Sequence, residues 1–149
     1  MSDSWLRYIP RNPDFRPSTE AAIAAEGLLR AYFPDAESVR FEAFEDVQFM
    51  DAGGNWAGVA CPSCGADAEP WWATAMSAAH KERFARLDVG APCCGVATSL
   101  NDLHYGWPCG FGVFVIEALN PNQKGLAAEK LAALGAVIGH PLREVPRHL

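Results

Sequence analysis

Hydrophobic positions in the first fifty residues predict a strand, a helix and a second strand. Residues 5–9 alternate loosely between apolar and polar side chains, which predicts a short strand. Ser18 or Thr19 then caps a segment with apolar residues at helical spacing, and Pro34 ends this helix. Residues 39–49 alternate apolar with charged or polar side chains, with an interruption at Glu45 and Asp46, so they are predicted to form a half-buried strand.

The last forty residues repeat this order. Residues 111–119 are almost wholly apolar, as in a strand buried on both faces. Residues 127–138 carry an apolar stripe at helical spacing, and Gly139 ends that helix. Residues 142–149 are predicted to be a last strand, and Pro146 within it requires an edge position.

The middle of the chain separates these two halves. A helix is predicted from Pro70 to about Phe84, then a strand at 87–89, and residues 97–105 can form its hairpin partner. Without this middle part, the order is strand, helix, strand, twice over, which is the split βαβ order of ferredoxin-like folds. We therefore expect an α+β fold in a single domain, 1–149, whose first and third strands are central.

Five cysteines supply the candidate chemistry, and two short motifs contain four of them. The first motif is Cys61-Pro-Ser-Cys64-Gly65, in which two thiols three positions apart can bind one tetrahedral zinc ion. The second, Pro-Cys93-Cys94-Gly, repeats the first with alanine at the place of the first cysteine. Residues 55–107 are therefore predicted to be an inserted, zinc-ribbon-like region.

The residues themselves leave the fourth zinc ligand open. Cys93 is favoured, because neighbouring side chains can converge in a tight turn, although in a strand they point to opposite faces. His80, His104 and Cys109 are the alternatives. His80 falls on the apolar stripe of the predicted helix, and Cys109 suits a small buried residue.

The motifs favour a structural rather than a catalytic zinc. Four thiolates close the coordination shell, whereas a catalytic zinc keeps one position open for water. The chain has no His-x-Glu followed by Pro-Cys-x-x-Cys, the pattern of zinc deaminases, and no His-Glu-x-x-His of metalloproteases. A thioredoxin-like role for Cys61 and Cys64 needs a helix directly after them, and the helix signal begins only at Pro70.

The negative charge of the chain is concentrated in one segment. The chain has a formal net charge of −6, and residues 35–51 contain six acids and one base. Glu42, Glu45 and Asp46 fall on a predicted edge strand and are candidate residues for binding a basic protein. The alternative is a solvated strand face. A nucleic-acid partner is not expected because no basic stripe is present, and the absence of a membrane-spanning run or signal peptide predicts a cytoplasmic protein.

Five strings together resemble a widespread family of small uncharacterised bacterial zinc-binding proteins with CPxCG and PCCG motifs. They are the residues 8–14, 49–55, 61–65, 92–95 and 99–103. Some members carry the label "sugar ABC transporter ATPase", but this chain has no Gly-Lys-Ser/Thr phosphate-binding loop. The resemblance implies that Cys93 and Cys94 act together as a recurring doublet, whereas Cys109 belongs to no motif of the family.

Sequence alone thus predicts a non-enzymatic protein with structural zinc that acts as a protein–protein interaction module. A toxin-neutralising, immunity-type protein is one concrete form of it. The alternative is a small enzyme of unknown reaction with a cleft beside the zinc region. Candidate polar groups for that cleft are Asp51, Asn55, Asn101, Asp102 and His104, beside Trp56, Trp71, Trp72 and Trp107.

Overall fold

The computed structural model describes residues 3–148, and its largest element is a four-stranded antiparallel sheet. Its strands are β1 (Ser4–Pro10), β2 (Ser38–Met50), β7 (Gly110–Leu119) and β8 (Leu142–His148). Two helices connect them, α1 (Thr19–Tyr32) and α3 (Ala128–Ile138). The α+β class predicted from sequence is therefore confirmed, and Leu149 of the predicted last strand lies outside the described residues.

The spatial order of the strands is β2-β7-β1-β8, so β1 and β7 are central and β2 and β8 are edges. The apolar run of β7 and Pro146 in β8 suit these positions. A central strand that ends in proline is accommodated because the pairing of β1 with β7 stops at Tyr8. Pro10 is opposite Leu142 of β8 and has no partner on β7, so its missing N–H interrupts no central ladder.

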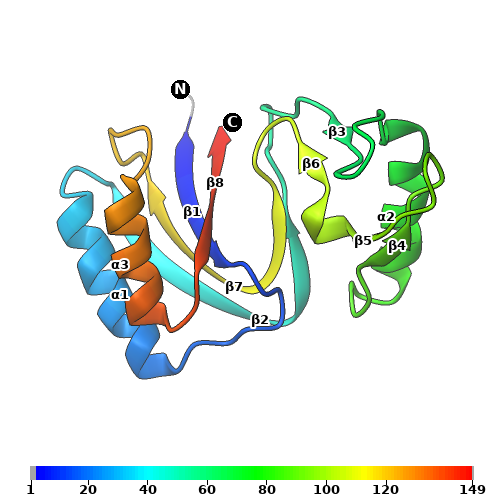
Figure 1. Ribbon diagram of the computed structural model, residues 1–149. Coiled ribbons are helices and arrows are strands. Elements are labelled where there is room, and N and C mark those ends of the chain that lie inside the picture. Colours follow the sequence, from blue (N-terminus) through cyan, green and yellow to red (C-terminus); the bar gives the residue numbers. More distant parts are fainter. Residues whose placement is uncertain (1–2, 149) are drawn as a thin grey trace.

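Helices α1 and α3 cover one face of the sheet (Figure 1). Ser18 caps α1, its hydroxyl accepting a hydrogen bond from the Ala21 N–H at 3.1 Å, and Pro34 follows the helix end. Helix α3 ends at Gly139, whose φ of +101° is left-handed. Apolar residues of both helices meet those on one face of β1, β2 and β7 in the main core, which includes Tyr8, Leu29, Phe114, Ile116, Leu134 and Ile138.

The interruption in the second predicted strand is a bulge. Ala43 of β2 pairs with Phe114 of β7, and Gln48 pairs with Gly112, so five steps along β2 face two steps along β7. The extra residues bend β2, as bulges do. Beyond the bulge the paired ends of β2 and β7 extend past the helical layer and carry the inserted region (Figure 1).

The insertion contains two small sheets and a helix. Its elements are β3 (Val59–Ala60), α2 (Glu69–Lys81), β4 (Asp88–Gly90), β5 (Ala97–Ser99), the 3₁₀ turn η1 (Leu100–Asp102) and β6 (His104–Tyr105). β4 and β5 form a hairpin, whereas β6 pairs with the distant strand β3, so residues 97–105 contribute to two small sheets rather than to one hairpin. The predicted end of the helix at Phe84 is wrong by three residues, because Arg83 and Phe84 adopt left-handed φ values of +56° and +55°.

The insertion packs against the sheet through a second core. Val47 of β2 and Phe111 and Val113 of β7 contact apolar residues of the insertion, among them Phe84 and Leu100. These sheet residues belong to the extended ends of β2 and β7. The insertion and the sheet therefore share buried surface and are held together by burial of apolar side chains.

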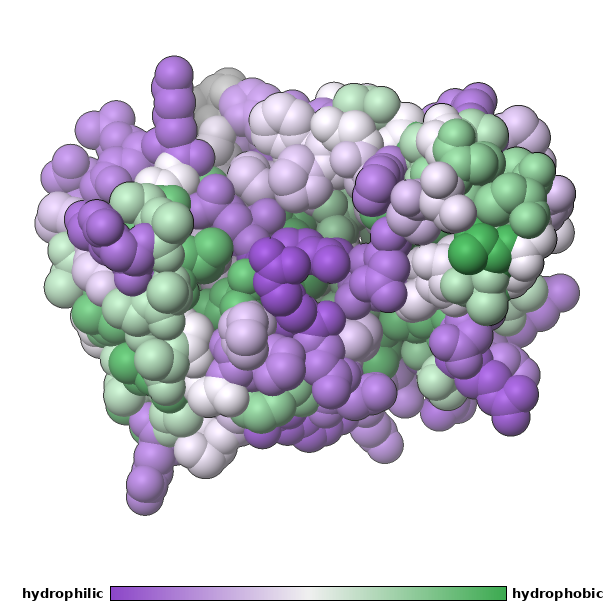
Figure 2. All heavy atoms as spheres, viewed as in Figure 1, coloured by the Kyte–Doolittle hydropathy of each residue, from purple (hydrophilic) through white to green (hydrophobic). Residues whose placement is uncertain are grey.

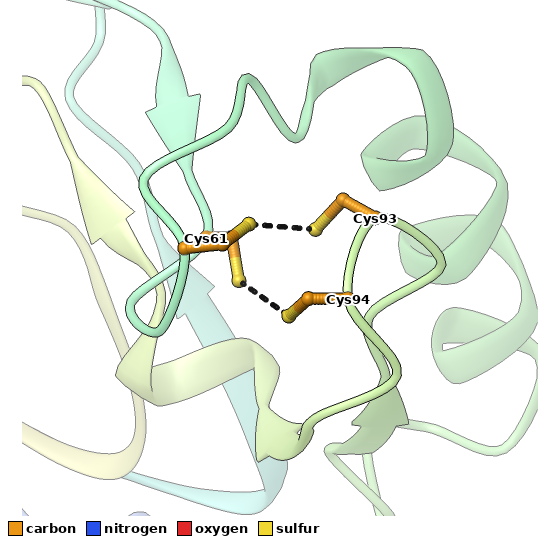
Figure 3. A group of neighbouring side chains, drawn as sticks. Cys61, Cys93 and Cys94 are labelled. Carbon is orange, nitrogen blue, oxygen red and sulfur yellow. Dashed lines mark hydrogen bonds between the residues drawn. The ribbon is translucent and has the colours of Figure 1, made fainter.

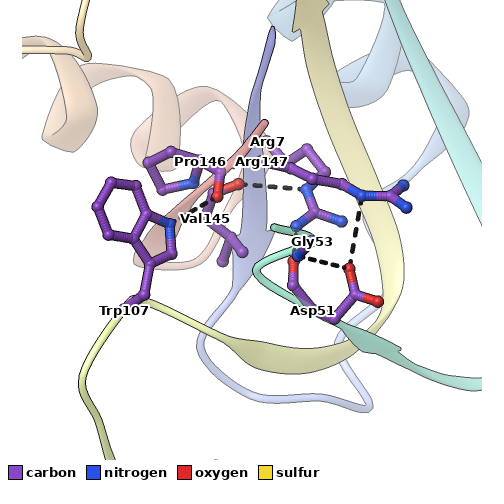
Figure 4. A network of polar contacts seen from close by, with 7 residues as sticks. All are labelled: Arg7, Asp51, Gly53, Trp107, Val145, Pro146 and Arg147. Atoms are coloured by element: carbon purple, nitrogen blue, oxygen red, sulfur yellow. Dashed lines mark hydrogen bonds and ion pairs between the residues drawn. The ribbon is translucent and has the colours of Figure 1, made fainter. Parts of the chain in front are cut away.

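Polar contacts add a second attachment on the sheet face opposite the helices (Figure 4). Arg7 is 6% exposed, and its guanidinium donates to the main-chain carbonyls of Val145 and Asp51. The Trp107 indole donates to the Pro146 carbonyl at 2.9 Å. Asp51 Oδ1 also lies 3.5 Å from Nε of Arg147 on β8. Both segments that flank the insertion therefore contact β8.

No helix among residues 3–148 is long and apolar enough to cross a membrane.

Candidate metal centre

The first cysteine motif forms a tight loop after β3. Cys61 N–H donates to the Ala66 carbonyl at 2.8 Å, and Gly65 N–H donates to the Cys61 carbonyl at 3.0 Å. Gly65 has a φ of +75°, a conformation that residues with a Cβ rarely adopt, so glycine is needed at this turn. The loop turns both thiols toward the same side.

The second motif forms the same loop between β4 and β5. Ala91 N–H donates to the Val96 carbonyl at 2.9 Å, Gly95 N–H donates to the Ala91 carbonyl at 2.7 Å, and Gly95 has a φ of +76°. Each bond repeats one of the first loop thirty residues later. By this correspondence Ala91 takes the place of Cys61, Cys94 that of Cys64, and Cys93 that of Ser63.

The two loops bring four thiols together. The Sγ atoms of Cys61, Cys64, Cys93 and Cys94 all lie within 4.8 Å of one another (Figure 3). Cys61 Sγ is 3.8 Å from Cys94 Sγ, and Cys64 Sγ is 3.4 Å from Cys93 Sγ. Tetrahedral zinc with Zn–S bonds of about 2.3 Å places its sulfurs ~3.8 Å apart. The four cysteines are therefore close enough to hold one metal ion.

The alternatives for the fourth ligand lie elsewhere. His80 is exposed on α2, with its ring 5.5 Å from that of Phe84. His104 is exposed in β6, and the thiol of Cys109, which is buried, donates to the Trp107 carbonyl at 3.3 Å. Among the described residues, the cluster that can hold a metal contains none of these three.

Electrostatics differ among the four thiols. Main-chain N–H groups of Cys64 and Ser63 lower the pKa of Cys61 to about 6, because they donate hydrogen bonds to the thiolate. The hydrogen bond with Cys64 raises the pKa of Cys93 to about 12. Cys61 is buried, whereas the other three thiols are exposed. The metal position thus lies at the surface, with Cys61 forming its inner side.

The polar residues considered for an enzymatic cleft make separate contacts. Asp51 accepts a hydrogen bond from the Gly53 N–H, and Asn101 donates to the Arg11 carbonyl and accepts from the Phe111 N–H. No hydrogen bond joins any two of Asp51, Asn55, Asn101, Asp102 and His104 within residues 3–148. Asn101 instead has a structural role, because it ties the insertion to the sheet.

The tryptophans beside the metal loops pack against one another. The rings of Trp56 and Trp72 are 4.8 Å apart, and the Trp72 indole donates to the Tyr105 hydroxyl at 3.2 Å. Trp71 and Trp72 both contact the second core. These contacts support the β3–β6 strand pair, from which the first cysteine loop begins.

The acidic residues proposed for partner binding lie on or beside the bulge of edge strand β2. Glu42 and Glu45 are exposed, whereas Asp46 is half-buried and lies 3.9 Å from the Arg83 guanidinium. Arg16 donates to the main-chain carbonyl of Glu45 at 2.7 Å. Glu42 and Glu45 therefore keep their charges uncompensated by any base within 4.0 Å among the described residues.

Sequence reasoning missed two arginines of the sheet, the buried Arg7 of β1 and the half-buried Arg143 of β8. The sequence signal for Arg7 is a charged residue between the apolar side chains of Leu6 and Tyr8, whereas Arg143 stands between Leu142 and Glu144 and has no such signal. No protein-family model, curated protein or solved structure matches this chain.

Proposed function

We propose that this chain is a non-enzymatic protein–protein interaction module: a ferredoxin-like sheet with a zinc-ribbon-like insertion held by one structural zinc ion. The convergence of four thiols from two equivalent loops carries this proposal. Cys61, Cys64, Cys93 and Cys94 would fill a tetrahedral shell, so no position would remain for water or substrate. The resemblance to the CPxCG and PCCG family belongs to the same proposal.

Zinc would act here by joining segments that have few apolar contacts of their own. β3 has two residues, and β4 and β5 have three each. Such short two-stranded pairs are marginally stable without a further link. A metal bound by one loop from each strand pair supplies that link, and the free energy of metal binding becomes free energy of folding.

The partner we propose is a basic protein that meets the edge of β2. Glu42 and Glu45 present uncompensated negative charge there, and such a patch accelerates association with a positively charged surface. A toxin-neutralising, immunity-type protein would use this arrangement, because it needs rapid capture of a basic toxin in the cytoplasm.

The test compares two charge reversals of equal size. Immobilised protein captures its partner from extracts of the native host, and association is then measured with the purified pair for Glu42→Lys/Glu45→Lys and for Glu20→Lys/Glu129→Lys. The first pair lies at the β2 edge and the second on the exposed surfaces of α1 and α3. We expect slower association for the first pair only, with the difference shrinking between 0.1 and 1 M salt as the Debye length falls from about 10 to about 3 Å.

An equal effect of both pairs would show that net charge alone matters and would reject the β2 edge as the docking surface. Turnover of a small molecule by the purified protein, lost on substitution near the zinc loops, would favour the enzyme instead.

A further inference from the structure

A hollow of about 450 Å³ lies where the insertion meets the start of β8. Among the residues that line it are the charged or polar Arg11, His104 and Arg143 and the apolar Leu103, Pro108 and Leu142. We refer to it as the Arg11–Arg143 hollow. In Figure 2, strongly hydrophilic residues gather in the middle of the visible face, between the helical layer and the zinc region. The hollow combines two guanidinium groups and an imidazole with an apolar wall.

Arg143 is fixed in one position. Its Nη1 donates to the Asn101 carbonyl at 3.0 Å, to Asn101 Oδ1 at 3.1 Å and to the Cys109 carbonyl at 2.9 Å. Its side chain crosses Gly110, where a Cβ would lie 3.0 Å from Nη1. Asn101 is itself buried and bonded to the Arg11 carbonyl. The guanidinium is therefore held before any ligand arrives.

The rest of that guanidinium is available. Within residues 3–148, Arg143 Nε and Nη2 donate to no protein acceptor, and neither Arg143 nor Arg11 has a carboxylate within 4.0 Å. Burial, together with the charge of Arg11, lowers the pKa of Arg143. Two cations that share a hollow without a counterion repel each other, and a bound anion removes that repulsion.

The acids near the hollow do not supply this counterion. Glu144 also lines it, but its Oε2 accepts hydrogen bonds from the Tyr8 hydroxyl at 2.8 Å and the Leu126 N–H at 2.9 Å. Asp102 acts on Arg143 only from beyond ion-pair distance, and its side chain is exposed. The positive charge of the two arginines remains unpaired.

We propose that the Arg11–Arg143 hollow binds a small organic anion, whose carboxylate or phosphate group lies between the two guanidinium groups. Arginine suits either group, because its planar fork matches two oxygens of an oxyanion. The His104 imidazole can donate one more hydrogen bond, and Leu103, Pro108 and Leu142 contact the apolar part of the ligand. This site does not depend on the zinc loops or on the acidic edge, so it goes beyond the proposed interaction module.

The test is titration of the full chain with three probes at constant ionic strength. Calorimetry measures the binding, and NMR of the arginine side-chain N–H groups locates it. Inorganic phosphate tests for a phosphate group, benzoate for a carboxylate with an apolar body, and benzyl alcohol for the apolar contact alone. We expect saturable binding of at least one anion, with shifts at Arg143 Nε–H, and much weaker binding of benzyl alcohol. The better anion identifies the chemical class of the ligand.

Variants then separate the hollow from general charge. Arg11→Gln should weaken binding of the preferred anion about tenfold, because one charge-assisted hydrogen bond is lost. Arg86→Gln, which removes an exposed arginine outside the hollow, should leave binding unchanged. At Arg143 the variant to use is Arg143→Lys, because Arg143→Gln also removes the charge and risks unfolding. Arg143→Lys retains the charge but loses the planar guanidinium, so it should weaken binding of the anion. Absence of saturable binding, equal losses in Arg11→Gln and Arg86→Gln, or equal affinity for benzyl alcohol would each overturn the proposal.

Discussion

Ala91 occupies in the second cysteine loop the position that Cys61 occupies in the first. Gly95 N–H donates to the Ala91 carbonyl as Gly65 N–H donates to the Cys61 carbonyl, and both residues are fully buried, each 0% exposed. A cysteine at position 91 would therefore supply the fourth thiol in a symmetric pair of loops. Cys93, two residues later, supplies the thiol in its stead.

This relationship predicts that the fourth ligand can be moved. Cys93→Ser should weaken zinc binding, because three thiols then remain in the cluster. Ala91→Cys added to Cys93→Ser turns the second loop into Cys-Pro-Ser-Cys-Gly, identical to the first, and should restore one tightly bound zinc per chain. Competition with a chromophoric chelator measures the affinity of both variants. A double variant that binds no better than Cys93→Ser would contradict the equivalence of the loops.

The wild-type protein should carry about one zinc per chain, and its stability should depend on it. Removal of the metal with a chelator, or Cys61→Ser, should lower the free energy of unfolding by several kcal/mol, because metal binding and folding are coupled. Elemental analysis and denaturant titration measure the two quantities. Cys109→Ser is the matched control: it buries a hydroxyl at a cost of about 1 to 3 kcal/mol and should leave the zinc content unchanged. Zinc loss in Cys109→Ser but not in Cys93→Ser would identify Cys109 as the fourth ligand.

Asn101 should be the polar residue on which attachment of the insertion depends most. Its side chain bonds with the Arg11 carbonyl, the Phe111 N–H and Arg143 Nη1, and it is 6% exposed. Asn101→Ala should lower the free energy of unfolding by about 1 to 3 kcal/mol, because it leaves the buried Phe111 N–H without an acceptor. The exposed neighbour Asp102 is the control, and Asp102→Ala should change stability by no more than about 0.5 kcal/mol. Equal stabilities of the two variants would show that the network contributes little.

Cys109 should make the protein lose stability in alkaline solution. Burial raises the pKa of Cys109 to about 11, whereas a thiol in an unfolded chain ionises near pH ~8.5. Between these values the unfolded chain has released the proton and the folded chain retains it, so the free energy of unfolding falls as pH rises. Below pH ~8.5 this contribution is fully present.

Denaturant titrations of zinc-loaded protein at pH 8 and pH 10 measure this effect. The decrease in unfolding free energy should be smaller in Cys109→Ala than in the wild type, by about 1 to 2 kcal/mol. Tyr105, whose pKa burial raises to about 12, is present in both proteins and cancels in the comparison. An identical decrease in both proteins would show that burial does not raise the pKa of Cys109 in the folded state.

Sequence by itself determined the elements and their class. Apolar periodicity located α1, α3 and β7, and local chemistry marked their ends, because Ser18, Pro34 and Gly139 act within one turn of the helix they cap or terminate. The sequence also identified the two cysteine motifs as equivalent loops, because each loop is a local turn whose shape depends on neighbouring residues. The notable local error was the end of α2, where the chain turns left-handed at Arg83 and Phe84.

Only the tertiary structure decided what depends on residues far apart in the chain. The two cysteine loops meet because the β3–β6 and β4–β5 strand pairs pack with α2 and the ends of β2 and β7. The position of Cys93 among the four thiols therefore followed from packing rather than from spacing in the sequence. The pairing of Asp46 with Arg83 depends on the same packing. The Arg11–Arg143 hollow joins the ends of β1 and β8 to the insertion. No local pattern in the chain encodes such a meeting, because burial of apolar surface throughout the molecule determines which distant segments come into contact.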